Sequence, residues 1–412
     1  MSAPLQACPG CDLLYRPVVP PRGGVAQCVR CGAVLRRGSH DSRDRALAFY
    51  LAAIIFFTLA NSYPLLSLRL HGAVNEASIP GSAALLAELG WPWLSAILIT
   101  TVILAPAVHI VGTTFVLLQI RWGWRTLWTG RLFRLAEQFQ TWGMAEVFVL
   151  GIIVCYVKLG KMAAILPGPS LYALGAFIIA AAAALSSLDP EAVWEDLDTA
   201  TANPEIPAGA RTAKQAALVA CESCGRLAVH GKSRSCARCG ATLHSRKPES
   251  RERTWALLAT AVILYIPANV LPVMRVVSLG RVQEDTIIGG TVYFARSGQW
   301  HLALIIFIAS VVVPIMKITI LTFLLVAEHA GSAWSPERRA GLYRITEFVG
   351  RWSMVDIFVV SLMVAMVELG NLASIAPGPG SVAFALLVVA TMLAAQSFDP
   401  RLLWDSLEPA NG

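Results

Sequence analysis

Long apolar segments separated by short polar ones dominate the pattern of this chain. Eight of them reach the roughly 18 to 20 residues that a helix needs to cross a bilayer. Because a helix satisfies its own backbone hydrogen bonds, we expect eight membrane-spanning helices. The segments are Leu47–Leu68, Leu94–Ile120, Met144–Leu166, Leu171–Leu188, Trp255–Val273, Leu302–Ala327, Ser353–Ala376 and Ser381–Phe398.

The apolar and polar pattern occurs twice, at a nearly constant offset. An N-x-x-P sequence, a W-x-M-x-[ED]-x-F run and a Pro-Gly-Pro sequence appear in the same order in both halves. Four spans per half return the chain to its starting side, so we expect two parallel repeats related by an axis along the membrane normal. The matched positions are Asn61 and Asn269, Pro64 and Pro272, Trp142 and Trp352, and Pro167 and Pro377.

The predicted fold is an all-α polytopic membrane protein of two four-helix bundles, each preceded by a small tetrathiolate domain of the zinc-ribbon or rubredoxin-like type. An Ala-, Thr- and Pro-rich linker between the halves is expected to be an exposed hinge. The two Pro-Gly-Pro sequences are expected to be simple turns. The predicted units are residues 1–45 (first cysteine domain), 46–199 (first bundle), 200–216 (linker), 217–250 (second cysteine domain) and 251–412 (second bundle).

Composition agrees with a membrane protein and charge gives its orientation. The chain has 412 residues, of which 56% are hydrophobic and only 14% charged, whereas soluble domains carry about 25% charged residues. If the amino terminus is cytoplasmic, 26 of the 33 lysine and arginine residues lie on the cytoplasmic side. The positive-inside rule therefore predicts that both termini and both cysteine domains are cytoplasmic. The net charge of +7 is a topology signal and does not indicate nucleic-acid binding.

Eight of the nine cysteines form Cys-x-x-Cys pairs, which predict two closed tetrathiolate sites. The two pairs of a set are separated by 16 residues in the first half and 11 in the second. We expect two ions, zinc by default, although iron uses the same ligands. Such a site has no open coordination position, so we expect it to be structural or a docking platform and assign no catalysis to it. The chain is not expected to be an enzyme. Dithiol redox chemistry is the alternative. The ligands are Cys8, Cys11, Cys28, Cys31, Cys221, Cys224, Cys236 and Cys239.

Charged residues inside spanning helices cost about 2.5 to 3.5 kcal/mol on insertion scales, so each suggests a function. The second half carries most of them. Lys317 and Ser310 share a face of the sixth helix, beside Pro314, which frees a backbone carbonyl. Ser353 and Asp356 share a face of the seventh, and Thr391 lies in the eighth. We predict a transport-related polar network from these residues. The alternative is that Lys317 and Asp356 simply neutralise each other.

The first half has lost most of this polar set. The corresponding positions are Val102, His109, Gly143, Glu146 and Ala181. Glu146, Lys158 and Glu368 lie nearer to helix ends, where long side chains extend to the interface. We include Glu146 and Glu368 in the network as peripheral members.

The motifs CPGC, CVRC, CESC and CARC, each pair ahead of a four-helix block with N-x-x-P, W-x-M-x-[ED]-x-F and PGP, resemble the paraquat-inducible protein A family. That family includes a relative in the lipophilic envelope-spanning tunnel system. The resemblance covers essentially the whole chain. It implies an inner-membrane subunit that works with a periplasmic MCE-domain protein and moves phospholipids between the membranes of a Gram-negative envelope.

Other functions remain open on the sequence. No GxxxxGK[ST] sequence is present, which argues against a P-loop nucleotide site. The alternative function is a stand-alone ion-coupled transporter of small hydrophobic or toxic compounds. A weaker alternative is an envelope redox enzyme that uses the cysteines.

Overall fold

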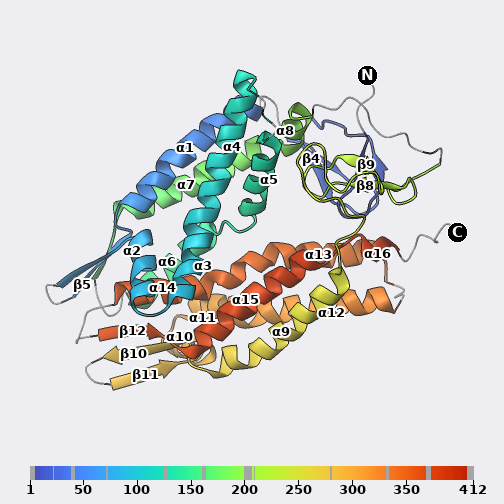
Figure 1. The fold of residues 1–412 in the computed structure, drawn as a ribbon. Coiled ribbons are helices and arrows are strands. Elements are labelled where there is room, and N and C mark those ends of the chain that lie inside the picture. The colour runs from blue at the N-terminus through green and yellow to red at the C-terminus, as the bar shows by residue number, and fades with distance from the viewer. Residues whose placement is uncertain are drawn as a thin grey trace.

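Among the residues that the computed structural model describes, eight helices are long and apolar enough to cross a membrane, which confirms the predicted number (Figure 1). The protein is therefore a multi-pass membrane protein. The spans are Arg43–Ser62, Pro92–Trp122, Thr129–Lys158, Pro169–Ser187, Ser250–Val270, Ala303–His329, Pro336–Met366 and Pro379–Ser397. The structure describes residues 5–21, 23–38, 42–70, 73–124, 126, 128–159, 164–198, 207, 209–278, 281–330, 334–367 and 373–405.

The two halves repeat the same order of helices. In the first half, α1 (Ser42–Ser62) lies beside α7 (Pro169–Ser187), and in the second α9 (Ser250–Val270) lies beside α15 (Pro379–Ser397). The other helices of the first half are α2 (Ile79–Glu88), α3 (Pro92–Leu98), α4 (Ala105–Trp122), α5 (Thr129–Gln140), α6 (Ala145–Leu159) and α8 (Pro190–Asp196). Those of the second are α10 (Ile287–Arg296), α11 (Trp300–Phe307), α12 (Val313–His329), α13 (Pro336–Gly350), α14 (Val355–Met366) and α16 (Leu402–Asp405).

The second span of each half contains a wide π-helical turn. It covers Ile99–Leu104 between α3 and α4 and Ile308–Val312 between α11 and α12. Each turn ends two residues before a proline, Pro106 or Pro314. Proline has no amide hydrogen, so the regular helical bonding cannot pass through it. Such turns often lie at functional sites.

The all-α prediction is wrong at one end of the bundles, where each half forms a three-stranded antiparallel sheet. The first has the order β6 (Ala73–Ala77), β5 (Leu66–Leu70), β7 (Ala164–Pro167), and the second β11 (Arg281–Asp285), β10 (Met274–Ser278), β12 (Ala373–Pro377). The first predicted span ran on to Leu68, but the helix ends at Ser62 and the strand begins at Leu66. Averaged hydropathy does not separate an apolar strand from a helix end.

The Pro-Gly-Pro sequences are not simple turns, because each joins a strand to a helix against the N-x-x-P sequence of the same half. The Gly168 amide donates to the Leu65 carbonyl at 2.9 Å, and the Gly378 amide to the Val273 carbonyl at 2.8 Å. A Cβ atom at Gly168 would overlap the Pro64 carbonyl oxygen. Glycine is therefore required by close backbone approach.

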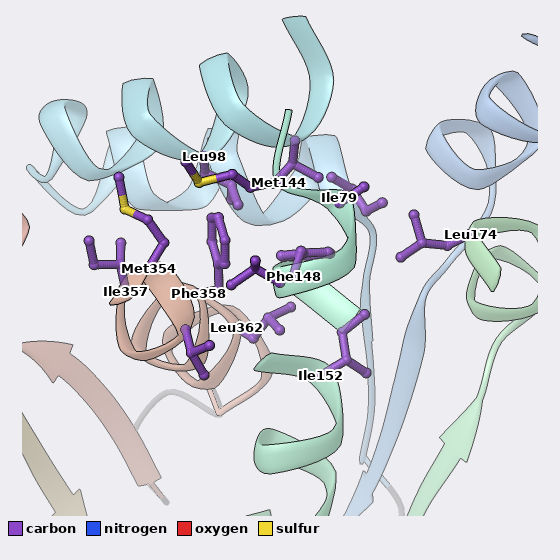
Figure 2. Packing of buried hydrophobic residues seen from close by; sticks show 14 of the residues in the cluster. Ile79, Leu98, Met144, Phe148, Ile152, Leu174, Met354, Ile357, Phe358 and Leu362 are labelled. Carbon is purple, nitrogen blue, oxygen red and sulfur yellow. The ribbon is translucent and has the colours of Figure 1, made fainter. Parts of the chain in front are cut away.

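The halves meet along α6 and α14, as Figure 2 shows. The equivalent residues Phe148 and Phe358 stack edge to face, with ring centroids 5.5 Å apart. Met144 and Met354, also equivalent, lie beside them. A Cβ at Gly151 would be 3.0 Å from the Phe358 Cβ, so the helices pack closely here. Residues of the same repeated motif thus form the centre of the interface between the halves.

Candidate functional site

Two cysteine domains lie at the end of the bundles opposite the sheets (Figure 1). The first cysteine domain (residues 5–38) contains β1 (Gln6–Ala7), β2 (Leu14–Tyr15), β3 (Val25–Gln27) and β4 (Val34–Arg37). The second (residues 217–247) contains β8 (Leu218–Ala220) and β9 (Leu227–Val229). Residues Thr212, Ala213 and Ala216 of the predicted linker are buried, and the Ala213 amide donates to the Asp12 carbonyl at 3.0 Å. This part of the linker is therefore packed and is not an exposed hinge.

Each cysteine domain gathers its four sulfurs around one point. All four lie within 4.8 Å of one another and are buried. The closest pairs, 3.5 Å apart, join the two knuckles: Cys8 with Cys31, Cys11 with Cys28, Cys221 with Cys239 and Cys224 with Cys236. A tetrahedral ion with bonds of about 2.3 Å to sulfur separates its ligands by roughly 3.8 Å. The chain therefore has two clusters capable of holding a metal ion.

The knuckles have the backbone that such a site needs. Gly32, Gly225 and Gly240 follow the last cysteine of three of the four knuckles with φ of +69°, +67° and +68°, a conformation that glycine adopts without strain. Asp12 follows the remaining knuckle with φ of +64°. An arginine inside each second knuckle braces the first. The guanidinium of Arg30 donates to the Cys11 carbonyl at 3.3 Å, and that of Arg238 to the Cys224 carbonyl at 3.1 Å.

The apolar packing of the cysteine domains is exchanged between the halves. Polar contacts still tie each domain to its own bundle, such as Arg36 with Asp189 at 2.8 Å in the first half. The cysteines of the first domain belong to a core cluster formed with helices of the second bundle, including Tyr343 and Trp404. Arg344 of α13 donates to the Cys31 and Gly32 carbonyls at 2.8 and 2.7 Å. The second domain instead packs on α5 of the first bundle, where a Cβ at Gly240 would be 3.0 Å from Arg131 Nε.

Ion pairs extend the contact between these domains and the bundles. Arg246 joins Asp12 at 3.3 Å to Asp405 at 2.8 Å. Arg401 pairs with Asp399 at 2.9 Å and with Glu222 at 2.7 Å. Burial alone would raise the pKa of Asp399, but hydrogen bonds and the charge of Arg401 hold it below its ordinary value. The two cysteine domains and the end of the second bundle are thus held together by charge as well as by packing.

The predicted polar residues of the second bundle form two separate contacts. The Lys317 ammonium, on α12, donates to the Thr391 hydroxyl, on α15, at 2.8 Å, and both side chains are buried. The Ser310 hydroxyl donates to the Asp356 carboxylate. No ion pair joins Lys317 to Asp356 among the described residues, so mutual neutralisation does not explain them. The Ser353 hydroxyl is buried without a hydrogen-bond partner in the described part of the chain.

The lysine beside Asp356 comes from the other half. Lys158 of α6, Asp285 and Asp356 line a cavity of about 70 Å³ at the interface between the halves. The Lys158 ammonium lies 5.6 Å from the centre of the Phe294 ring. Lys158 therefore points into this interface and does not extend to the membrane surface as its position near a helix end suggested. Glu146, at the position equivalent to Asp356, is exposed. Glu368 lies outside the described residues.

The first bundle keeps a neutral polar cluster at the position equivalent to Lys317. His109 Nδ1 lies 3.0 Å from the Ala136 carbonyl oxygen, and Nε2 lies 3.2 Å from the Tyr50 hydroxyl. Because a carbonyl only accepts, Nδ1 carries the hydrogen, and in the neutral imidazole Nε2 accepts from the Tyr50 hydroxyl. The sequence reasoning overlooked Tyr50, since one tyrosine inside an apolar window gives no signal of its partner.

A family model described as "Paraquat-inducible protein A" matches residues 44–198 and again residues 251–408. The chain belongs to the paraquat-inducible protein A family. The two matches cover the two bundles, so this family's repeat is present in both halves. Both sets of cysteines lie outside the matched residues. The cavity beside Asp356 is lined by Lys158 from the first matched region and by Asp356 from the second.

Relatives of the family match over nearly the whole chain. The "Intermembrane transport protein PqiA" of Escherichia coli K12 is 32% identical over 97% of this chain and 95% of its own length. The "Lipophilic envelope-spanning tunnel protein A" of the same organism is 30% identical over 98% of this chain and 92% of its own length. A "Probable intermembrane transport protein" of Haemophilus influenzae is 28% identical over 96% and 95%. No solved structure matches the chain.

Proposed function

We propose that this protein is an inner-membrane subunit of a lipid-transport system of the bacterial envelope. In this proposal it loads phospholipids into, or unloads them from, a tunnel formed by a periplasmic MCE-domain protein. The observation that carries the proposal is the similarity, over 97% of the chain, to a relative named for intermembrane transport. We assign no catalytic step, nucleotide or nucleic acid to the chain.

The proposed orientation has both termini and both cysteine domains in the cytoplasm. The distribution of lysine and arginine supports it. The arrangement in Figure 1 is consistent with it, because the cysteine domains and the two sheets lie at opposite ends of the bundles. The sheets and the short helices α2 and α10 would then face the periplasm and the proposed partner.

We propose that zinc occupies both four-cysteine sites, although iron suits the same ligands. Bound zinc supplies a rigid tetrahedral crosslink between two knuckles. Eight thiolates of this chain hold the two ions, and the backbones around them pack against α5 and α13. The role proposed for the metal is therefore structural.

The second bundle is the proposed site of energy coupling. Lys317 with Thr391, and Ser310 with Asp356, are polar contacts between spanning helices, where charge is expensive. A proton that enters or leaves one of these contacts changes its charge and therefore the packing of the helices. Ser353 lies three residues before Asp356 in the sequence. Glu146 and Glu368 are peripheral members of the network in this proposal.

Photo-crosslinking in cells tests the proposed partner. Exposed positions at the sheet end include Val282, 65% exposed, and Leu89, 40% exposed, whereas Val29 of the first cysteine domain is 95% exposed. Crosslinkers at Val282 and Leu89 should capture an MCE-domain protein, and one at Val29 should not. Capture from Val29 alone would reverse the orientation. Capture from neither, with lipid-free protein by native mass spectrometry, would favour the stand-alone transporter.

A further inference from the structure

A cavity of about 710 Å³ lies where the two cysteine domains meet the second bundle. This volume is within the range of small-molecule sites. It also leaves room for many water molecules. Both cysteine domains and Glu191 of α8 line it, and Tyr343 and Glu347 of α13 line it from the second bundle. It is separate from the cavity beside Asp356.

Most charged groups around this cavity already have partners. Arg401 is bound by Asp399 and Glu222, Arg344 donates to backbone carbonyls, and Lys247 donates to the Gln396 carbonyl at 2.6 Å. Glu191 accepts from Gln6 at 2.8 Å. Glu347 is exposed and has no ion pair or hydrogen bond to any described residue. The other titratable groups that line the cavity are Tyr15, Tyr343 and the ligands Cys8, Cys31 and Cys221.

The helices that border the cavity also border Lys317. Glu347 lies three residues before Gly350 on α13, or about 4.5 Å along the helix axis. A Cβ at Gly350 would be 3.8 Å from the Lys317 ammonium nitrogen. On α15, the Ala395 carbonyl accepts from the Tyr343 hydroxyl at 2.9 Å. Thr391, the partner of Lys317, lies one turn before Ala395. The cavity and the buried amine are therefore about one helical turn apart.

We propose that this cavity is the water-filled cytoplasmic entrance to Lys317 and that Glu347 passes protons between them. The inference rests on the proposed function, since it supplies the route for the coupling proton. A hydronium ion in the cavity gives its proton to the Glu347 carboxylate and becomes water. The carboxylic acid then passes a proton through water to the neutral amine of Lys317, which becomes ammonium, and the carboxylate is regenerated. Release follows the same steps in reverse.

Proton flux into proteoliposomes tests this entrance, with full-length, metal-loaded protein and a pH-sensitive dye inside. Glu347→Gln should slow the flux by about 10²-fold, at the lower end of what a positioned proton-transfer group contributes. Glu337→Gln is the matched control, because Glu337 is exposed on the same helix but does not line the cavity. Glu347→Asp should restore part of the flux and shift its pH profile. Unchanged flux and pH profile in Glu347→Gln would overturn the proposal.

Lys317→Ala separates this inference from the proposed function. If Lys317→Ala stops the flux while Glu347→Gln does not, protons reach the lysine by another route and only the entrance is wrong. If the wild-type protein carries no proton flux but still loads lipid, the entrance and the proton coupling both fail, while the lipid-transport role remains.

Discussion

At the scale of single residues, Asp356 and Lys317 differ from the picture that spacing suggested. Each is held by a hydroxyl, Ser310 or Thr391, and neither is paired with the other among the described residues. Their separation follows from the packing of three spans, which the sequence of one helix does not reveal. The sequence identified the charged residues because charge is conspicuous in an apolar segment. It missed Lys158 as the lysine beside Asp356, because that contact joins two halves of the chain.

Lys317→Ala and Asp356→Asn should each abolish envelope-barrier function, measured as sensitivity of cells to detergent, while expression and metal content stay normal. The physical reason is that each removes a group that can change charge inside the membrane. The double variant Lys317→Ala, Asp356→Ala should stay inactive, because the two charges do not compensate each other. Glu146→Gln, at the exposed equivalent of Asp356, is the control and should resemble wild type, and His109→Ala should be mild. Full recovery in the double variant would contradict the coupling role.

Asp399 should make stability depend on pH. Its pKa in the folded protein is held below the unfolded value of about 3.9. The ionised carboxylate therefore stabilises the fold above about pH 4, and this contribution is lost as the pH falls through the folded pKa. Asp399→Asn should cost roughly 3 kcal/mol near neutral pH, because it leaves Arg401 buried without its carboxylate. Thermal unfolding in detergent from pH 3 to 7 should show a weaker pH dependence in the variant. If stability depended on pH equally in both proteins, groups other than Asp399 would be responsible for the dependence.

At the scale of elements, the eight spans were predictable and the two sheets were not. Apolar length alone marks a spanning helix, whereas Leu66–Leu70 is only five residues long and pairs with Ala164–Pro167, almost 100 residues away. That register depends on where two helices end in space. The Pro-Gly-Pro and N-x-x-P sequences were each noticed, but their contact was not, because only the folded backbone brings Gly168 against Pro64.

Gly168→Ala and Gly378→Ala should each lower the free energy of unfolding by about 1 to 3 kcal/mol, since the added methyl group would overlap a carbonyl oxygen of Pro64 or Pro272. Gly175→Ala in α7 is the matched control. A Cβ there would meet nothing within 4 Å, and alanine favours a helix by up to about 1 kcal/mol. Thermal unfolding of the purified proteins measures the difference. Equal stability of Gly168→Ala and Gly175→Ala would mean that the strand and helix can separate without cost.

At the scale of the whole molecule, the exchanged cysteine domains join the two halves. Spacing of the cysteines was enough to predict the two four-sulfur clusters, because a Cys-x-x-Cys knuckle is local. The surface on which each cluster rests was not predictable, since Arg344 reaches Cys31 from more than 300 residues away. A simple duplication would suggest that each domain packs on its own bundle.

Cys28→Ser and Cys236→Ser should each lose one metal ion per chain, because three thiolates bind far less tightly than four. Because each cysteine domain packs on a helix of the other half, that helix should lose protection when the metal is lost. Cys28→Ser should increase hydrogen exchange in α13, and Cys236→Ser in α5. Cys155→Ser is the control and should keep both ions, since Cys155 lies in α6 outside both clusters. Elemental analysis and hydrogen exchange measure the two effects. Increased hydrogen exchange in α5, and not in α13, of Cys28→Ser would contradict the packing of the first cysteine domain on the second bundle.

The packing of the first cysteine domain also sets an order of events during synthesis. This domain precedes every described helix in the chain, yet Arg30 lies over the ring of Trp404, 4.6 Å from its centre. Domains generally fold as they emerge, from the amino terminus onward. Here the four cysteines of the first domain can come together early, but the domain must wait, undocked, until the segment that carries Trp404 has been made. Its docking would therefore follow the synthesis of α16, and a chain stalled before α16 would leave the first cysteine domain without this part of its binding surface.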